Sequence, residues 1–210
     1  MSYKVAIITR TKDRQVLLSR AVLSVIKQTY SDWIHVIVND GGCSEVVERS
    51  VAAHRKAYGD RLKILHHKES MGMQSASNAG IAACESTYLV IHDDDDSWAP
   101  SYLEACVGYL ENAGPQSRYQ GVIAHTERIY EETDNHGQPI EKYREDHIPL
   151  DQVSLFRAGF ENPFAPIAFL FRRTAYEAVG PFNQDYTVLG DWDFHCRFLQ
   201  QFEIGVVPEK

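Results

Sequence analysis

The sequence has no two cysteines at C-x-x-C spacing, and its four cysteines lie far apart along the chain. This pattern indicates neither a zinc site nor a disulfide framework, so we expect free thiols and a reducing compartment. No apolar run approaches the roughly 20 residues of a membrane-spanning helix, and the N-terminus lacks the pattern of a signal peptide. These absences predict a cytoplasmic protein without a transmembrane segment.

Basic stretches and glycine-rich phosphate loops are also absent. The formal net charge is -8, so the molecule as a whole repels polyanions and nucleic acid is not an expected partner. Neither G-x-x-x-x-G-K nor G-x-G-x-x-G occurs, which disfavours P-loop NTPases and nicotinamide enzymes. A phosphate-bearing ligand would depend on a metal ion and on arginine instead.

The most unusual feature that is present is a run of four aspartates, residues 93–96, directly after the apolar residues 88–91. Carboxylates this dense repel one another, and Mg²⁺, Mn²⁺ or Ca²⁺ would relieve that repulsion, because these ions prefer oxygen ligands. The run therefore indicates a metal site at the end of a strand. The alternative is an exposed acidic turn before a helix that begins at Pro100.

The apolar pattern predicts an α/β fold. With 210 residues, 44% of them hydrophobic, the chain is long enough for one core and one domain. Short apolar runs alternate four times with segments of helical period, which predicts a mainly parallel sheet with strands at 3–9, 34–38, 62–66 and 88–92. Two more strands are predicted at 121–130 and 167–172. The polar stretch 131–147 is interpreted as a solvated loop, with a mobile lid as the alternative.

Polar residues cluster just after the predicted strands. Ligands of open α/β sheets bind beyond the carboxyl ends of the strands, where loops and helix N-termini converge. Strand one ends in Thr-Arg-Thr at 9–11, strand two in Asn-Asp-Gly-Gly at 39–42, and strand four in His92 and the aspartates. Asp40 either caps its turn or binds a ligand. His66 and His67 are interpreted as ordinary histidines at a strand end.

A second acidic segment, Gly-Asp-Trp-Asp-Phe, lies at residues 190–194. Phe194 and Phe198 share one face of a predicted helix, which puts Asp191 at the start of that helix. An aspartate in this place can simply be an N-cap. The neighbouring Gly190 and Trp192 also suit an open approach and an apolar platform for a sugar, so both interpretations stay open.

In their order along the chain, these motifs resemble family 2 of the inverting glycosyltransferases, which have the GT-A nucleotide-diphospho-sugar transferase fold. The matching segments cover nearly the whole chain and read VAIITRTKDR, SVIKQTYSDW, VNDGG, ASNAGIAACESTYLVIHDDDDSWAP and GDWDF. The resemblance implies a Rossmann-like, mainly parallel sheet flanked by helices. It also implies one catalytic domain, 1–210, in which residues 1–115 bind the nucleotide sugar and residues 116–210 form a smaller acceptor-binding half.

The resemblance assigns residues to the nucleotide. Thr9, Arg10 and Thr11 would line the nucleotide pocket, and Asp40 would accept hydrogen bonds from the base. Family members often have arginine where this chain has Ser77. One polar contact to the nucleotide is therefore expected to be missing or to come from another residue.

The resemblance also assigns the aspartates. Asp93 and Asp95 would form the D-x-D pair, in which Asp95 binds the metal and Asp93 or Asp94 lies near the ribose. Asp191 would be the catalytic base, with Asp193 as the alternative. The expected cofactor is a divalent ion, Mn²⁺ or Mg²⁺.

The implied reaction moves a sugar from a nucleotide-diphospho-sugar to an acceptor hydroxyl with inversion, in polysaccharide or glycoconjugate synthesis. The metal stabilises the leaving diphosphate, and a carboxylate takes the proton of the hydroxyl. A saccharide or lipid-linked acceptor is the expected second partner, and peripheral association with the inner face of the membrane would suit the latter. Family members commonly continue past the strand at 206–207 with a histidine that helps to hold metal or diphosphate, so the chain is expected to be a catalytic fragment.

Two other functions fit parts of the sequence. A sugar-1-phosphate nucleotidyltransferase would share the sheet and the acidic metal site, but it usually begins with a glycine-rich basic loop that this chain lacks. A non-catalytic nucleotide- or sugar-binding module of the same fold is the other alternative. The presence of Asp40, Asp93, Asp95 and Asp191 argues against it, and turnover would decide.

Overall fold

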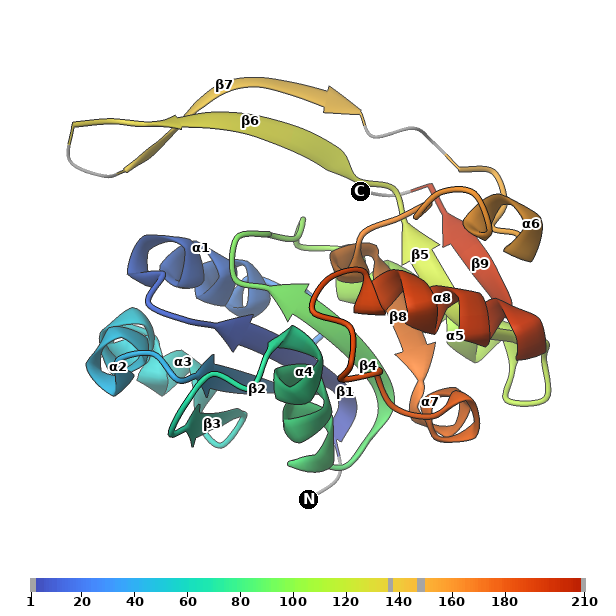
Figure 1. The fold of residues 1–210 in the computed structure, drawn as a ribbon, viewed down its shortest axis with the longest axis horizontal. Helices are drawn as coiled ribbons and strands as arrows, with labels where there is room; N and C mark the ends of the chain where they lie inside the picture. Colours follow the sequence, from blue (N-terminus) through green and yellow to red (C-terminus); the bar gives the residue numbers. More distant parts are fainter. Residues whose placement is uncertain (1–2, 136–137, 147–149, 209–210) are drawn as a thin grey trace.

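The computed structural model describes residues 3–135, 138–146 and 150–208. Its centre is a seven-stranded sheet in the order β3-β2-β1-β4-β8-β5-β9 (Figure 1). The first four predicted strands are confirmed, and they pair in parallel. Their bounds are Tyr3–Thr11 for β1, Trp33–Asp40 for β2, Leu62–His67 for β3 and Ser86–Asp93 for β4.

The second half of the chain completes the sheet with mixed directions. Strand β8 (Phe169–Arg172) runs antiparallel between β4 and β5 (Tyr119–Ala124), and β9 (Glu203–Val207) pairs in parallel with β5. The strand predicted at 167–172 begins later than expected, because the 3₁₀ turn η1 (Pro166–Ala168) occupies its first residues. The mainly parallel α/β prediction is therefore confirmed.

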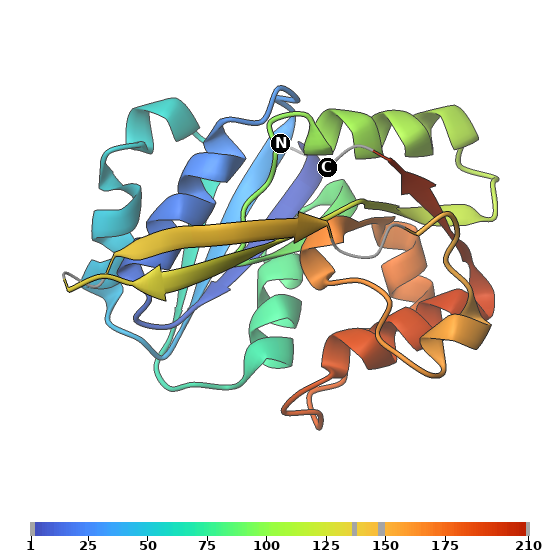
Figure 2. The ribbon, with the colours of Figure 1, turned by 90° about the horizontal axis from the view of Figure 1, so that it is seen from above.

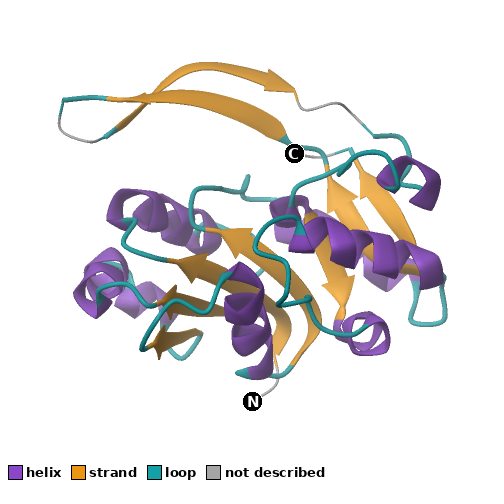
Figure 3. Cartoon of the chain, viewed as in Figure 1, coloured by secondary structure: helices purple, strands orange, loops and turns teal. Residues whose placement is uncertain are grey.

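Helices cover both faces of the sheet (Figure 3). One apolar cluster joins the sheet to α1 (Gln15–Ile26), α2 (Ser44–Ala52) and α5 (Tyr102–Ala113), and the other joins it to α4 (Met73–Ala82), α7 (Arg173–Val179) and α8 (Gly190–Gln201). Helix α1 illustrates the cause, because Leu18, Val22 and Val25 recur at helical spacing and are fully buried. Two short helices complete the fold, α3 (Arg55–Tyr58) and α6 (Leu155–Ala158).

The polar stretch 131–147 was predicted to be a solvated loop, and this prediction was wrong, because most of its described residues form strands. The chain leaves β5 at Ala124 and forms a two-stranded antiparallel hairpin outside the sheet, β6 (Glu127–Thr133) and β7 (Pro139–Asp146). The strand predicted at 121–130 is therefore two strands, broken at residues 125–126. Gly137 and His147, which belong to the predicted loop, lie outside the described residues. Seen from above, the hairpin crosses over α1 (Figure 2).

The hairpin escaped prediction because both of its faces are polar and exposed. Without a buried face, its strands show no alternation of apolar and polar side chains, which is the pattern that predicts strands. An ion pair between Glu131 and Arg20 ties β6 to α1. Among the described residues, no helix is long and apolar enough to cross a membrane. The expected cytoplasmic location stays a prediction.

Candidate functional site

A cavity of about 350 Å³ lies at the carboxyl end of the parallel strands. It is lined by the ends of β1, β2 and β4 and by the start of α4, so that residues from four separate segments meet there. The side chains of Arg10, Thr11, Asp40 and Asp95 are among its walls. This is the edge of the sheet at which the sequence places its unusual polar residues.

Arg10 and Asp93, which both line this cavity, form an ion pair. They are register partners on the neighbouring strands β1 and β4. The Nε of Arg10 lies 3.0 Å from Asp93 Oδ1, and Nη2 donates to the same oxygen. Nη1 donates to the Ser77 hydroxyl at 3.3 Å. The arginine side chain is only 10% exposed, so Asp93 is its fixed counter-ion and Ser77 completes the site on α4.

The rest of the aspartate run meets two more arginines. Arg14 Nη1 lies 3.1 Å from Asp94 Oδ1 and 3.0 Å from Asp95 Oδ2. Arg20 Nη2 donates to the backbone carbonyl of Asp95 at 2.6 Å. Burial raises the pKa of Asp94, and burial together with repulsion from neighbouring aspartates raises the pKa of Asp96 to about 7. The run is therefore a place where additional positive charge would be stabilising.

The carboxylates suit a cation that is shared with a ligand, rather than a complete protein cage. Within the described parts of the chain, no three His, Cys, Asp or Glu residues are arranged to hold a metal ion. Nucleotide-bound Mg²⁺ usually takes one or two carboxylates and completes its shell with phosphates and water. Asp95 fits that role, because its side chain is half exposed and lines the cavity.

Asp40 lies in the wall of the cavity, and its carboxylate binds the loop at residues 70–72. Its carboxylate accepts hydrogen bonds from His67 Nδ1 and Ser70 Oγ at 2.8 Å, from the Met71 N–H at 2.9 Å and from the Gly72 N–H at 3.0 Å. Burial alone would raise the pKa of this carboxyl, but the hydrogen bonds to its anion outweigh burial and lower the pKa. His67 is therefore more than an ordinary strand-end residue, since it pairs with Asp40 across β2 and β3.

Thr9 lies beneath the cavity rather than in its wall. Its side chain is fully buried, and its hydroxyl lies 2.8 Å from His35 Nε2 and 3.4 Å from His92 Nδ1. Burial lowers the pKa of both imidazoles, that of His92 to about 3, so these rings are neutral. Of the three residues that the resemblance assigns to the nucleotide pocket, Arg10 and Thr11 line the cavity, whereas Thr9 packs in the core.

Asp191 lies in the first turn of α8 and is oriented by an asparagine. Its Oδ2 accepts a hydrogen bond from Asn162 Nδ2 at 2.8 Å. The other end of that amide, Oδ1, lies 3.1 Å from His195 Nδ1. Burial lowers the pKa of His195 to about 3, so the ring is neutral and donates its Nδ1–H to Asn162. Asn162 was missed by sequence reasoning, and no local signal marks it.

Asp193, the alternative base, already has a partner. Its Oδ2 accepts from Arg197 Nε at 2.9 Å, and Arg197 also donates to carbonyl oxygens of residues 179–181. The start of α8 packs on the start of α4, where a Cβ on Gly190 would lie 2.4 Å from the side chain of Gln74. The residue before Gln74 on α4, Met73, lines the cavity. The close packing brings the start of α8, which carries Asp191, toward the start of α4 at this cavity.

A model of the family described as "Glycosyl transferase family 2" matches residues 6–180. The chain belongs to this family. Over 210 residues it is 22% identical to the uncharacterized glycosyltransferase YwdF of Bacillus subtilis (strain 168), a match that covers 98% of this chain and 71% of YwdF.

Solved structures share the fold. TarS of S. aureus, crystallised in complex with UDP-GlcNAc, superposes with a TM-score of 0.76 at 15% identity. The mannosyltransferase PcManGT of Pyrobaculum calidifontis, in complex with GDP-Man and Mn²⁺, superposes with a TM-score of 0.71 at 16% identity. Each match covers 99% of this chain, which spans 56% of the TarS chain and 55% of the PcManGT chain.

Proposed function

We propose that this chain transfers a sugar from a nucleotide-diphospho-sugar to an acceptor hydroxyl with inversion, as a metal-dependent step in polysaccharide or glycoconjugate synthesis. The observation that carries the proposal is the cavity of about 350 Å³ in which Arg10, Asp40 and the aspartate run converge. Family membership and the nucleotide sugars bound by TarS and PcManGT support a donor of this class.

The donor would lie with its base near Asp40 and its diphosphate near Asp95. Each carboxylate oxygen accepts about two hydrogen bonds, and all four places on Asp40 are taken. A base contact therefore requires the side chain of His67 or Ser70 to turn away, whereas the two backbone donors stay. Thr11 and Arg10 supply further polar contacts in the cavity wall, and Asp93 or Asp94 would lie near the ribose.

A divalent ion held by Asp95 would supply Lewis-acid stabilisation of the charge that develops on the departing diphosphate. The chain itself holds Asp95 ready for this ion. Arg20 fixes the backbone of Asp95, and Arg14 pairs with its carboxylate. The guanidinium of Arg14 is half exposed and is free to turn from the aspartates to a bound phosphate.

Asp191 would take the proton from the attacking hydroxyl. Asn162 holds one oxygen of Asp191, which leaves the other oxygen to accept the proton. One base and one displacement give inversion at the anomeric carbon. The ion pair of Asp193 with Arg197 makes Asp193 the weaker candidate.

Binding of nucleotide sugars with and without Mn²⁺ tests the proposal. A donor present at about 100 times its dissociation constant should add roughly 2.7 kcal/mol, or about 5 to 10 °C in melting temperature, for a UDP- or GDP-sugar panel. Asp95→Ala should lose the Mn²⁺-dependent part, whereas the exposed Asp60→Ala should keep it. Equal nucleotide affinity in EDTA and in Mn²⁺ would contradict the metal role, and no response to any nucleotide would contradict the donor class.

A further inference from the structure

A groove lies on the side of the aspartate run that faces the hairpin. It consists of two adjoining pockets of about 420 and 290 Å³, which share Asp96, Ser97, Thr126, Glu127, Ile129 and Ile167 in their linings. The first begins at Asp95, and the second ends at Trp98 and Tyr102. Strand β6 forms the wall opposite the aspartates. None of these residues except Asp95 lines the nucleotide cavity.

Asp95 is the point at which the two cavities meet. In a transfer reaction the donor sugar and the acceptor must meet at one place, and the donor's diphosphate is assigned to Asp95 in the proposed function. Asn162, which donates a hydrogen bond to Asp191, and Ala165, which lines the groove, lie in the same loop. The groove therefore opens toward both the diphosphate position and the segment that orients the proposed base.

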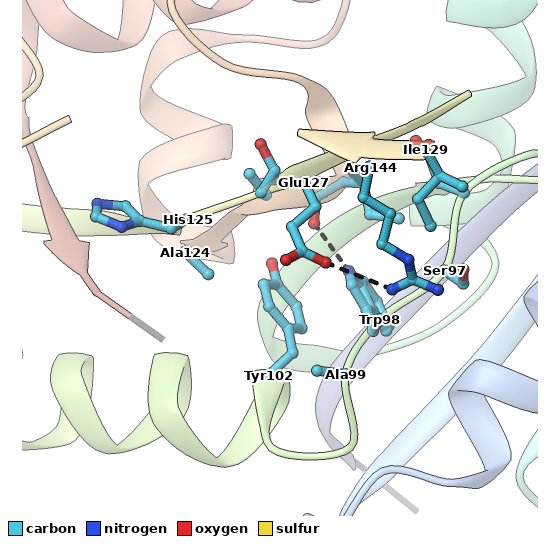
Figure 4. A pocket seen from close by; sticks show the side chains of 13 residues that line it. Ser97, Trp98, Ala99, Tyr102, Ala124, His125, Glu127, Ile129 and Arg144 are labelled. Carbon is cyan, nitrogen blue, oxygen red and sulfur yellow. Dashed lines mark hydrogen bonds and ion pairs between the residues drawn. The ribbon is translucent and has the colours of Figure 1, made fainter. Parts of the chain in front are cut away.

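The charges in the groove are nearly balanced. The linings contain four carboxylates and three guanidinium groups, and several are already paired. Glu131 pairs with Arg20, and Glu127 lies 3.5 Å from Arg144 across the mouth of the smaller pocket (Figure 4). A phosphate or pyrophosphate group would find no excess of positive charge there. The balance favours an uncharged ligand that offers many hydroxyl groups to carboxylates and guanidinium groups.

Aromatic rings in the walls suit the apolar faces of sugar rings. Trp98 is fixed by the stack of its ring on Tyr102, at 4.5 Å between centroids, and by a hydrogen bond from its Nε1–H to the Ile167 carbonyl at 2.9 Å (Figure 4). Tyr130 is fixed in the same way, by its stack on Tyr143 at 4.2 Å. Rings held in place beforehand lose little conformational entropy on binding a ligand.

We propose that this groove beneath the hairpin binds the acceptor, and that the acceptor is an uncharged saccharide rather than a phosphate-linked lipid. The inference rests on the proposed function and narrows it to one acceptor class. The hairpin is the acceptor-contacting element of the chain, and the pairing of Glu131 with Arg20 holds it against the catalytic half.

The test follows the indole N–H signals of the isotope-labelled full chain, loaded with UDP and Mn²⁺. The probes are methyl glycosides of neutral hexoses and N-acetylhexosamines, and glucose 1-phosphate is the charged counterpart of methyl glucoside. The chain has three tryptophans, and Trp98→Phe assigns the signal of interest. At least one neutral glycoside should shift the Trp98 signal saturably, while the signal of the buried Trp33 should stay unchanged.

Two matched substitutions on the hairpin localise the site. Ile129→Trp fills the groove and should weaken saccharide binding at least about tenfold. Ile140→Trp adds the same ring to an exposed position of β7 that does not line the groove, and it should leave saccharide binding unchanged. Both variants should keep wild-type affinity for UDP with Mn²⁺. Arg144→Gln, which opens the pair with Glu127, is a second test and should also weaken saccharide binding.

The outcomes separate this inference from the proposed function. If UDP binds with Mn²⁺ but no neutral glycoside shifts Trp98, or if Ile129→Trp binds the saccharide normally, the acceptor assignment is wrong and the donor assignment stands. Tighter binding of glucose 1-phosphate than of methyl glucoside, with the same Trp98 shift, overturns the uncharged class. A chain that binds no UDP removes the proposed function and this inference together.

Discussion

Replacement of Asp40 by alanine should destabilise the chain strongly, because this one carboxylate organises the loop at residues 70–72. The carboxylate accepts four hydrogen bonds, and the residue is only 8% exposed. A hydrogen bond to a charged group contributes about 1.5 to 3 kcal/mol. Since the loop is exposed and water can replace part of these contacts, we expect a loss of about 3 kcal/mol rather than the full sum.

For a domain of this size, 1 kcal/mol corresponds to about 2 to 4 °C, so Asp40→Ala should lower the melting temperature by about 6 to 12 °C at pH 7. Ser70→Ala removes one donor and should cost about 1 kcal/mol, or about 2 to 4 °C. Thermal unfolding by circular dichroism measures both. If the melting temperature of Asp40→Ala lies within about 2 °C of wild type, Asp40 does not stabilise the loop at residues 70–72 as we infer.

The acid dependence gives a second measure of the same contacts. The pKa of Asp40 is lowered in the folded chain from its ordinary value of 3.8, so its stabilising contribution is fully present above pH 3.8 and disappears as the pH falls through the folded pKa. The stability difference between wild type and Asp40→Ala should therefore shrink in strong acid.

Calorimetric titration with ligands tests whether Asp40 also contacts the base. If it does, Asp40→Ala should bind both uridine and UDP more weakly, by the same factor.

Three further predictions concern the rest of the site. Asp191→Asn should reduce transfer by about 10² to 10⁴ while donor affinity and melting temperature change little, and Asp193→Asn should retain most activity; the reverse result would exchange their roles. Arg20→Gln frees the Asp95 carbonyl and should weaken Mn²⁺-dependent UDP binding by about 1 kcal/mol, measured against unchanged binding of uridine. His195 is neutral in the fold, because its pKa is about 3 there instead of the ordinary 6.5. As the pH falls below 6.5, the unfolded chain binds a proton at this histidine and the folded chain does not, so the free energy of unfolding decreases. Urea titrations should show wild type losing about 2 kcal/mol more than His195→Asn between pH 7 and pH 5.

The first half of the fold was predictable because its signals are local. Strands β1, β2 and β4 consist mostly of buried apolar residues, and helix α1 buries one apolar stripe, so the apolar pattern alone locates these elements. Strand order is a different matter. The antiparallel strand β8 lies between β4 and β5, and its partners are about 80 positions away on β4 and about 50 positions away on β5. Nothing in the local pattern specifies these pairings. The exposed hairpin leaves no local pattern either.

The residues of the candidate site also differ in whether the sequence predicts them. Arg10, Asp40 and the aspartates stand out because charged groups directly after apolar strands are unusual, and the strand-end rule then brings them together. Asn162 stands in an irregular segment and matters only through its contacts with Asp191 and His195, 29 and 33 residues away. Thr9 shows the opposite case: it belongs to the same segment, but it lies two residues before the end of β1, where its side chain is fully buried against His35 and His92.

The aspartate run depends on neighbouring arginines that lie far from it in the sequence. Four adjacent carboxylates would destabilise a strand end in isolation, yet Arg10, Arg14 and Arg20 come from β1, its following loop and α1. Strand β1 lies beside β4, so a single βα unit delivers all three guanidinium groups to the run. The arginines hold the carboxylates in place, and Arg14 is the more exposed member of its pairs with Asp94 and Asp95. The motif thus works as a unit of strand β1, helix α1 and the end of β4.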